Sequence, residues 1–349
     1  MTTHRTATLT DEHASALAGW LREAGVEGGP ELQVLPIGAG QGTANVMFEL
    51  RWGDRRLVLR HPPWRKVTES AGSVEREARL LAALDRTSAP HAGFVELCLD
   101  PDVIGVPFLV MEHVDGYVPS DPLPSRLQDH AARHGIGLVL VDALAELAMV
   151  DWRAVGLEGF GNPDGFLARQ VDRWLWQLDS YKVRDVESLP EVVNWLRANL
   201  PAPGPIGIMH GDFSTFNVML AADGEQRVAA ILDWDTATIG EALMDLGHLL
   251  SRWDEPGERP TTLGSSDIAD RAGLCSRQEL VDRYASRTGF DVSGIRYYEV
   301  LSLFKLSCIM EGQYANHMRT RPDKPLGPYT NIGPGLMDDA LRIALGEIH

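Results

Sequence analysis

Two short stretches, residues 210–217 (HGDFSTFN) and 231–235 (ILDWD), constrain this chain more than any other part of its sequence. In the first, Asp212 stands five residues before Asn217, and in the second Asp233 ends an apolar run. Phosphoryl transfer needs one carboxylate to accept a hydroxyl proton and two oxygen ligands to hold Mg²⁺ on a nucleotide. The residue types and their spacing therefore predict a phosphoryl-transfer centre.

The strands around these motifs explain how the residues could meet. Residues 218–220 and 228–232 are apolar runs separated by a segment with an Asp-Gly turn signal, which predicts an antiparallel hairpin. In such a hairpin the start of the first strand lies beside the end of the second, so Asn217 and Asp233 should meet at one edge. An amide oxygen and a carboxylate there suit a hard cation such as Mg²⁺. Asp212 would stay free to orient an acceptor hydroxyl and take its proton.

The pattern His-Gly-Asp, four residues, Asn, and then a strand ending in Asp-Trp-Asp resembles the aminoglycoside phosphotransferase and choline kinase family, small-molecule relatives of the protein kinases. The resemblance implies an α+β, two-lobed protein-kinase-like fold with a small antiparallel-sheet N-lobe and a larger, mainly helical C-lobe. It implies that Asp212 is the catalytic base, that Asn217 and Asp233 are metal ligands, and that Asp235 supports a second metal or the loop. A capping role for Asp235 is the alternative. By the same resemblance, Asp245 braces the catalytic loop.

Two other interpretations stay open. Residues 230–236 (AILDWDT) also resemble the nucleophile strand of haloacid-dehalogenase-type phosphatases, in which the first Asp, here Asp233, attacks phosphate. That family places Thr or Val where this chain has Ala237, and it needs a downstream Lys, for which only Lys305 and Lys324 remain. The second interpretation is a kinase-like protein that binds nucleotide without catalysis, which the presence of a base and two metal ligands disfavours.

Upstream, strand-like runs at residues 32–37, 45–51 and 56–60 predict the sheet of a nucleotide-covering lobe. The first two flank a glycine turn that contains Gly40 and Gly42. Glycines let backbone N–H groups approach phosphates, so we expect nucleotide contacts there, with a plain hairpin turn as the alternative.

Arg60 stands on the third of these strands, where protein kinases carry a Lys that contacts phosphate. An Arg keeps the charge, but its planar guanidinium need not support the same phosphate geometry. We expect Arg60 to pair with Glu77, on a helix that Ser73 caps. The alternative is that Glu75 and Glu77 are only favourable acids in a first helical turn.

The apolar run at residues 106–111 passes into a polar exit that resembles the hinge between kinase lobes. We expect adenine to bond to backbone groups from Glu112 to Val114. The chain would then divide into an N-terminal nucleotide-binding lobe, residues 1–113, and a C-terminal catalytic and substrate-binding lobe, residues 114–349. Helical patterns in the second lobe cover residues 137–150, 166–178, 190–200, 241–250, 276–287 and 297–318.

Composition limits the partners and the location. The formal net charge of −17 disfavours nucleic acid, because neutralising its phosphates needs a basic surface. No apolar run approaches the roughly 18 residues of a membrane span, and the first residues lack a hydrophobic targeting core. The 3 cysteines are isolated, so neither a zinc site nor a disulfide framework is indicated. We expect a cytoplasmic protein, and the sequence leaves its oligomeric state open.

The acceptor has two candidates. An acidic chain suits a cationic acceptor such as an aminoglycoside. A finer resemblance, carried by residues 58–63 (VLRHPP), 74–77 (VERE) and 151–157 (DWRAVGL), is to a branch related to domains fused with acyl-CoA dehydrogenases, some of which phosphorylate hydroxyacyl groups. The combined prediction is transfer of the γ-phosphoryl group of ATP or GTP, with Mg²⁺, to a hydroxyl of one of these small molecules.

Overall fold

The computed structural model describes residues 9–37, 46–62, 73–120, 122–257, 261–263, 268 and 271–348. The chain divides into two compact units, of which unit 1 is Met1–Asp115 with Ala230–Asp235, and unit 2 is Gly116–Ala229 with Thr236–His349. Ala230–Asp235, called the acidic segment below, belongs to unit 1 although the chain on both sides of it belongs to unit 2. The division predicted between residues 113 and 114 assigned this segment to the C-terminal lobe.

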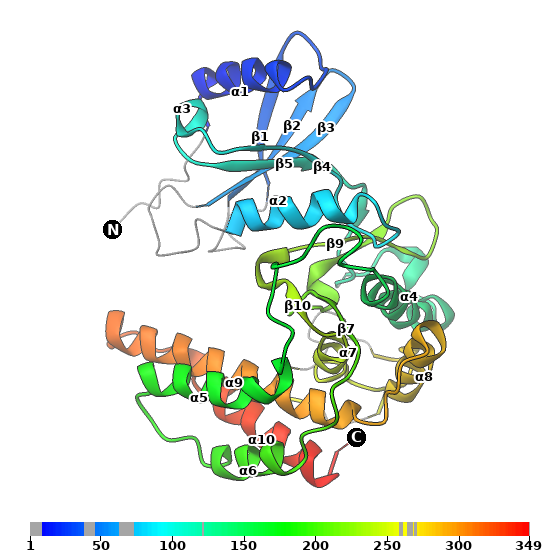
Figure 1. The fold of residues 1–349 in the computed structure, drawn as a ribbon, viewed down its shortest axis with the longest axis vertical. Coiled ribbons are helices and arrows are strands. Elements are labelled where there is room, and N and C mark those ends of the chain that lie inside the picture. Colours follow the sequence, from blue (N-terminus) through cyan, green and yellow to red (C-terminus); the bar gives the residue numbers. More distant parts are fainter. Residues whose placement is uncertain are drawn as a thin grey trace. The chain divides into compact units, whose positions relative to one another are not determined.

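Unit 1 is built on a five-stranded antiparallel sheet with the strand order β1-β2-β3-β5-β4 (Figure 1). The strands are β1 (Leu32–Ile37), β2 (Val46–Trp52), β3 (Arg55–His61), β4 (Phe94–Cys98) and β5 (Phe108–Glu112). The helices are α1 (Asp11–Glu23), α2 (Ser73–Leu84) and the short α3 (Pro101–Ile104). This antiparallel sheet confirms the predicted architecture of the N-terminal part.

Alternation along β3 decides which side chains reach each face of the sheet. Leu57 and Leu59 are buried in the apolar core that α1 completes with Leu17 and Leu21. Arg60 comes directly after Leu59, so its side chain leaves the sheet on the opposite face, on which α2 lies (Figure 1). The period-two pattern of the strand therefore directs Arg60 towards α2.

The acidic segment is attached to unit 1 through the chain that precedes β4. The backbone N–H of Ile231 donates to the carbonyl oxygen of Pro90 at 3.0 Å. Ile231 also forms an isolated parallel bridge with His91. These bonds fix the start of the segment, and Asp233 and Asp235 follow within four residues.

Unit 2 contains two small sheets. One pairs β7 (Ile206–Met209) antiparallel with β10 (Thr238–Glu241), and in the other β6 (Gly116–Tyr117), β8 (Val218–Ala221) and β9 (Val228–Ile231) lie in the order β6-β8-β9. The last two residues of β9, Ala230 and Ile231, are also the first two of the acidic segment. The β8 and β9 strands are the two strands of the predicted hairpin. Short 3₁₀ turns span Ser125–Leu127, Thr215–Asn217, Trp234–Thr236 and Gly327–Asn331.

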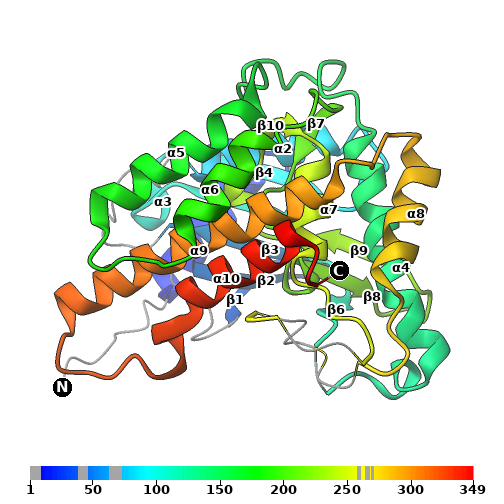
Figure 2. The same ribbon diagram turned by 90° about the horizontal axis from the view of Figure 1, so that it is seen from below.

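The helices of unit 2 are α4 (His130–Ala148), α5 (Phe166–Tyr181), α6 (Leu189–Ala198), α7 (Leu243–Leu250), α8 (Arg277–Thr288), α9 (Ile295–Thr320) and α10 (Ile332–Leu345). Helix α9 packs against α5, α7 and α10, and α4 packs against α8 (Figure 2). The predicted largely helical C-terminal part is therefore confirmed. No helix in the described ranges combines the length and the apolar character that crossing a bilayer requires.

Helix α4 begins earlier than the sequence predicted. We expected it from residue 137, but it starts at His130, because the Asp129 carboxylate caps it by accepting the N–H of Ala132 at 2.8 Å. Its first turns carry polar residues, which do not contribute to the apolar pattern. The buried central part of the helix is as expected.

Candidate active site

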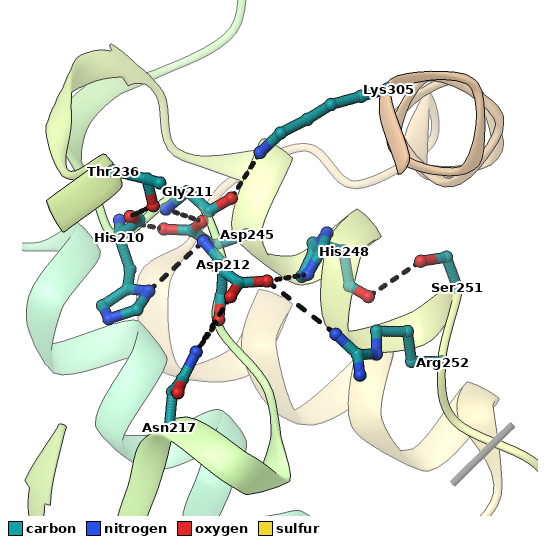
Figure 3. A network of polar contacts seen from close by, with 10 residues as sticks. All are labelled: His210, Gly211, Asp212, Asn217, Thr236, Asp245, His248, Ser251, Arg252 and Lys305. Carbon is teal, nitrogen blue, oxygen red and sulfur yellow. Dashed lines mark hydrogen bonds and ion pairs between the residues drawn. The ribbon is translucent and has the colours of Figure 1, made fainter. Parts of the chain in front are cut away.

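The loop that follows β7 is held in place by side chains from other segments, which form hydrogen bonds with the loop backbone (Figure 3). The Asp245 carboxylate accepts the N–H of His210 at 2.6 Å and the N–H of Gly211 at 2.7 Å. The Thr236 hydroxyl donates to the carbonyl oxygen of His210 at 2.8 Å, and the Lys305 ammonium donates to that of Gly211 at 2.5 Å. Asp245 therefore braces the loop, as the sequence predicted, and Thr236 and Lys305, from two other segments of unit 2, hold it in place.

Gly211 is required by this arrangement for two reasons. Its φ is +84°, in the left-handed region that residues with a Cβ rarely adopt. A Cβ there would also lie 2.9 Å from the carbonyl oxygen of Thr236. The glycine allows the chain to turn sharply between His210 and Asp212.

The Asp212 carboxylate is the focus of the loop (Figure 3). Nε2 of His248 lies 3.0 Å from its Oδ1, and a guanidinium nitrogen of Arg252 lies 3.8 Å from the same oxygen. The amide nitrogen of Asn217 donates to Oδ2 at 3.1 Å and to the backbone oxygen of Asp212 at 2.9 Å. The side chain is still 42% exposed, so an acceptor hydroxyl can approach it.

These neighbours set the protonation of the two side chains. Burial alone would raise the pKa of Asp212, but the hydrogen bond from His248 and the charges of Arg252 and Lys305 bring that pKa well below its usual range. Burial lowers the pKa of His248 and outweighs the opposing effect of Asp212. At neutral pH, Asp212 is therefore an ionised acceptor and His248 a neutral donor.

Unit 1 contains a second cluster around Arg60, which we call the arginine cluster. Arg60 lies 2.7 Å from Glu77, 3.2 Å from Asp233 and 2.8 Å from Asp235, measured between side-chain nitrogen and oxygen atoms. Arg60 and Glu77 are buried, whereas Asp233 has 54% of its side chain exposed. The predicted pair of Arg60 with Glu77 is present, and Glu75 is exposed to solvent.

The arginine cluster holds one positive group against three carboxylates. Burial raises the pKa of Glu77 to about 7; Arg60 opposes this shift, while Asp235 and Asp233 add to it. The pKa of Arg60 is raised because the three acids together outweigh its burial. Excess negative charge beside the exposed Asp233 suits a cation, so this donor set fits Mg²⁺.

The backbone conformation of Asp233 is also typical of a functional site. Among the described residues it is the only one other than glycine with a positive φ, at +61°. An Asp tolerates the left-handed region better than most residues, yet the conformation still costs of order 1–3 kcal/mol and is concentrated at functional sites. The bonds of the acidic segment to Pro90 and Arg60 hold it there.

The remaining ligands of a cation must come from elsewhere. The described residues contain no group of three or more His, Cys, Asp or Glu side chains that could hold a metal ion by themselves. Asn217 uses its amide nitrogen on Asp212, which leaves its amide oxygen to face a cation. Mg²⁺ usually takes few protein ligands and completes its shell with phosphates and water.

The predicted nucleotide contacts are only partly described. Gly40 and Gly42 lie outside the described residues. At the end of β5, the N–H of Glu112 donates to the carbonyl oxygen of Gly93 at 2.8 Å, and the side chain of Glu112 pairs with Arg55. The N–H of His113 donates to Arg56 at 3.2 Å. A contact of the Val114 backbone with adenine stays a prediction.

Sequence reasoning brought together some of these residues and missed others. Asp212 and Asn217 meet in unit 2, and Arg60, Glu77, Asp233 and Asp235 meet in unit 1. A shared position for Asn217 and Asp233 stays a prediction.

The residues that sequence reasoning missed are His248, Arg252 and Lys305. A signal existed for His248, which stands three residues after Asp245 and so on the same face of a helix. Lys305 stands 94 residues from the loop it contacts and carries no local signal.

A two-unit molecule with a five-stranded antiparallel sheet, a largely helical second unit and a braced His-Gly-Asp loop defines a kinase-like phosphotransferase. Comparison with protein families agrees, because the model of the phosphotransferase enzyme family, APH, matches residues 36–274. The chain belongs to this family.

Individual proteins extend the comparison. Acyl-CoA dehydrogenase family member 11 of Mus musculus is 32% identical over 281 residues, which cover 79% of this chain and 36% of that protein. The chain thus spans about a third of the length of that relative. A candidate aminoglycoside phosphotransferase of Ralstonia eutropha, known from its crystal structure, is 27% identical, with a TM-score of 0.79 and coverage of 95% of this chain and 98% of that one.

More distant structures share the fold alone. The GDP complex of aminoglycoside 2′-phosphotransferase-IIIa is 15% identical with a TM-score of 0.60, covering 96% of this chain and 99% of that one. A complex of aminoglycoside phosphotransferase APH(4)-Ia with ADP and hygromycin B is 14% identical with a TM-score of 0.57, covering 93% and 97%. Both proteins bind a nucleoside diphosphate in these structures.

Proposed function

We propose that this protein transfers the γ-phosphoryl group of ATP or GTP to a hydroxyl group of a small molecule. The observation that carries the proposal is the Asp212 carboxylate, which is ionised, partly exposed and held by Asn217 and His248 on a braced loop. Family membership and the nucleotide complexes of the distant structures support the same reaction.

Each residue has a role that follows from its position. Asp212 accepts a hydrogen bond from the acceptor hydroxyl, orients its oxygen towards the γ-phosphorus and takes the proton as the new P–O bond forms. Because the pKa of Asp212 is low, its main contribution is orientation, with proton uptake late in the transfer. Arg60, fixed by Glu77, would steady the phosphates, and the backbone of Val114 would hold adenine.

Asn217 and Asp233 would hold Mg²⁺ through an amide oxygen and a carboxylate oxygen. When bound, the metal would neutralise charge on the phosphate oxygens. Asp235 would keep Arg60 in place beside Asp233, since it already pairs with that guanidinium at 2.8 Å.

The charge near Asp212 favours a hydroxyacyl acceptor over an aminoglycoside. Arg252 lies 3.8 Å from the carboxylate, the charge of Lys305 also acts on it, and both side chains would repel a polycation. The similarity to acyl-CoA dehydrogenase family member 11 supports the same choice.

The test is a screen for acceptor-dependent nucleoside diphosphate formation. The chain is mixed with Mg²⁺ and either ATP or GTP, and with an aminoglycoside, choline, a macrolide or a hydroxyacyl thioester. Phosphorus NMR then identifies the phosphate ester that forms. We expect one acceptor class, the hydroxyacyl thioesters, to yield a new phosphate monoester.

Two results would replace this proposal. Release of phosphate from a generic phosphomonoester without nucleotide, with a covalent phosphate on Asp233, would indicate the phosphatase. Tight nucleotide binding without transfer to any acceptor or to water would indicate a catalytically silent homologue.

A further inference from the structure

One helix of unit 2 presents two polar side chains to the catalytic loop. Asp245 and His248 stand three residues apart on α7, so they lie on the same face of that helix. Asp245 holds the backbone of the loop, and His248 reaches the carboxylate of Asp212 (Figure 3). The residues of α7 are all buried, which makes the helix a firm support for both contacts.

We propose that His248 is a positioning residue that fixes the carboxylate of Asp212 for phosphoryl transfer. The proposal rests on the proposed function, because it assumes that Asp212 receives the acceptor hydroxyl. It assigns His248 no contact with the substrate.

An imidazole at this buried position carries a cost in free energy. His248 is 2% exposed, and its Nδ1 atom is buried without a hydrogen-bond partner among the described residues. A buried polar atom without a partner costs free energy, and an apolar side chain of similar size would avoid that cost. The contact that offsets it is the 3.0 Å bond from Nε2 to Asp212. Packing alone therefore does not explain a histidine here.

His248 acts on Asp212 as an uncharged donor. Burial keeps the ring of His248 neutral, so it donates through Nε2–H while Nδ1 keeps its lone pair. A neutral donor holds the carboxylate in place without adding a full positive charge beside it. Asp212 therefore remains a better hydrogen-bond acceptor for a hydroxyl than it would be if paired closely with a cation.

The two oxygens of the Asp212 carboxylate are held by different side chains. His248 holds Oδ1 of Asp212, and Asn217 holds Oδ2 at 3.1 Å from the other side. Two donors on two oxygens fix the plane of the carboxylate, and each oxygen keeps a lone pair for the acceptor. Without His248 the group could rotate about its side-chain bonds, and a misplacement of about 1 Å can cost on the order of a hundredfold in rate.

The test compares two substitutions that differ in one donor. His248→Leu removes the hydrogen bond and keeps an apolar filling, whereas the amide nitrogen of His248→Gln takes the place of Nε2. His134→Leu is the matched control, because it breaks a histidine–carboxylate contact of 2.8 Å, to Glu279, at the surface of the same unit. Steady-state transfer from ATP with Mg²⁺ is measured with the acceptor found by the screen and with water, which gives kcat and the KM for ATP for each variant.

We expect His248→Leu to lower kcat by about 10- to 100-fold with little change in the KM for ATP, His248→Gln to recover most of the rate, and His134→Leu to match the original chain. A His248→Leu rate equal to that of the original chain would overturn the proposal. So would equal losses in both His248 variants, since the hydrogen bond would then not matter.

A second readout does not depend on turnover. With ¹⁵N-labelled histidine, NMR of the full chain should show a neutral imidazole protonated at Nε2 that disappears in His248→Gln and shifts in Asp212→Asn. If the original chain transfers phosphate to no acceptor, the proposed function fails. The spectrum still tests whether His248 donates a hydrogen bond to Asp212. Absence of that signal, or no shift in Asp212→Asn, would refute the contact.

Discussion

At the scale of single residues, the carboxylate of the candidate base, Asp212, is positioned by side chains that form hydrogen bonds with it. Asp212 follows a glycine with a positive φ, and its two carboxylate oxygens are held by different donors, His248 and Asn217. Its low pKa makes orientation of the hydroxyl its main task.

The first prediction concerns this carboxylate. Asp212→Asn keeps the size of the side chain and an oxygen that can accept from His248, but it removes the charge. We expect kcat to fall by about 100-fold or more, because a positioned base contributes about that much. Nucleotide affinity, measured by calorimetry, should stay largely unchanged. Full retained activity would refute the assignment of Asp212 as the base.

A carboxylate outside the site gives a prediction on pH. Glu49 on β2 accepts hydrogen bonds from Arg51 and Arg56, each at 2.9 Å, and these bonds lower its pKa from 4.5 to about 2. An acid with a depressed pKa stabilises the fold above its unfolded pKa and loses that contribution as the pH falls towards the folded value. The stabilisation is thus present above pH 4.5 and is lost between 4.5 and 2.

The measurement compares the thermal midpoints of the original chain and Glu49→Gln. The original chain should have the higher midpoint at neutral pH, and the difference should shrink as the pH falls below 4.5. A difference that stays constant down to pH 3 would contradict the assignment.

At the scale of elements, helix α7 connects the fold to the site. Asp245 and His248 reach the loop only if α7 lies close against α9, and Gly247 permits that approach. A Cβ on Gly247 would lie 2.5 Å from the side chain of Tyr298 and 2.9 Å from the backbone nitrogen of Glu299.

A Gly→Ala substitution should therefore have opposite effects on the free energy of unfolding in α7 and in α1. Gly247→Ala forces α7 away from α9 and should destabilise the protein by about 1–3 kcal/mol, with a loss of activity. Gly19→Ala is the control, because a Cβ at Gly19 in α1 meets nothing within 4 Å. It should stabilise by up to about 1 kcal/mol through helix propensity. Urea unfolding measures the free energy of unfolding of both variants. A change of the same sign in the two variants would contradict the close packing of α7 against α9.

Sequence patterns predicted those features that depend on local periodicity. Arg60 and Glu77 were paired from the resemblance to protein kinases, in which a Lys on the third strand pairs with a Glu on the next helix, and the structure joins them at 2.7 Å. The helix predicted over residues 276–287 is present as α8, and a capping box between Ser276 and Glu279 begins it. The early start of α4 was not predicted, because polar side chains in its first turns hide the helical pattern.

Long-range contacts explain what the sequence did not predict. Lys305 meets the loop from 94 residues away, and nothing in its own surroundings indicates that contact. His248 stands 36 residues from Asp212, and its place three residues after Asp245 on α7 is the one local signal for it. The acidic segment was assigned to the larger lobe from its place in the chain. Its bonds to Pro90 and Arg60 place it in unit 1 instead.

At the scale of the whole molecule, the account depends on residues carried by two units. Asp212 and Asn217 belong to unit 2, whereas Arg60 and Asp233 belong to unit 1. One covalent feature links the two sets: Thr236, which bonds to His210, directly follows Asp235 in the chain. The central claim is that Asn217 and Asp233 hold one cation on the nucleotide.

The most direct test of this claim is a double-mutant cycle. Mg²⁺ affinity is measured by calorimetry in the presence of a non-hydrolysable ATP analogue for the original chain, Asn217→Ala, Asp233→Ala and the double variant. If both residues hold one ion, each single change should weaken binding, and the double change should cost clearly less than the two losses added together. Independent losses that add, or affinity unchanged by either substitution, would contradict the claim.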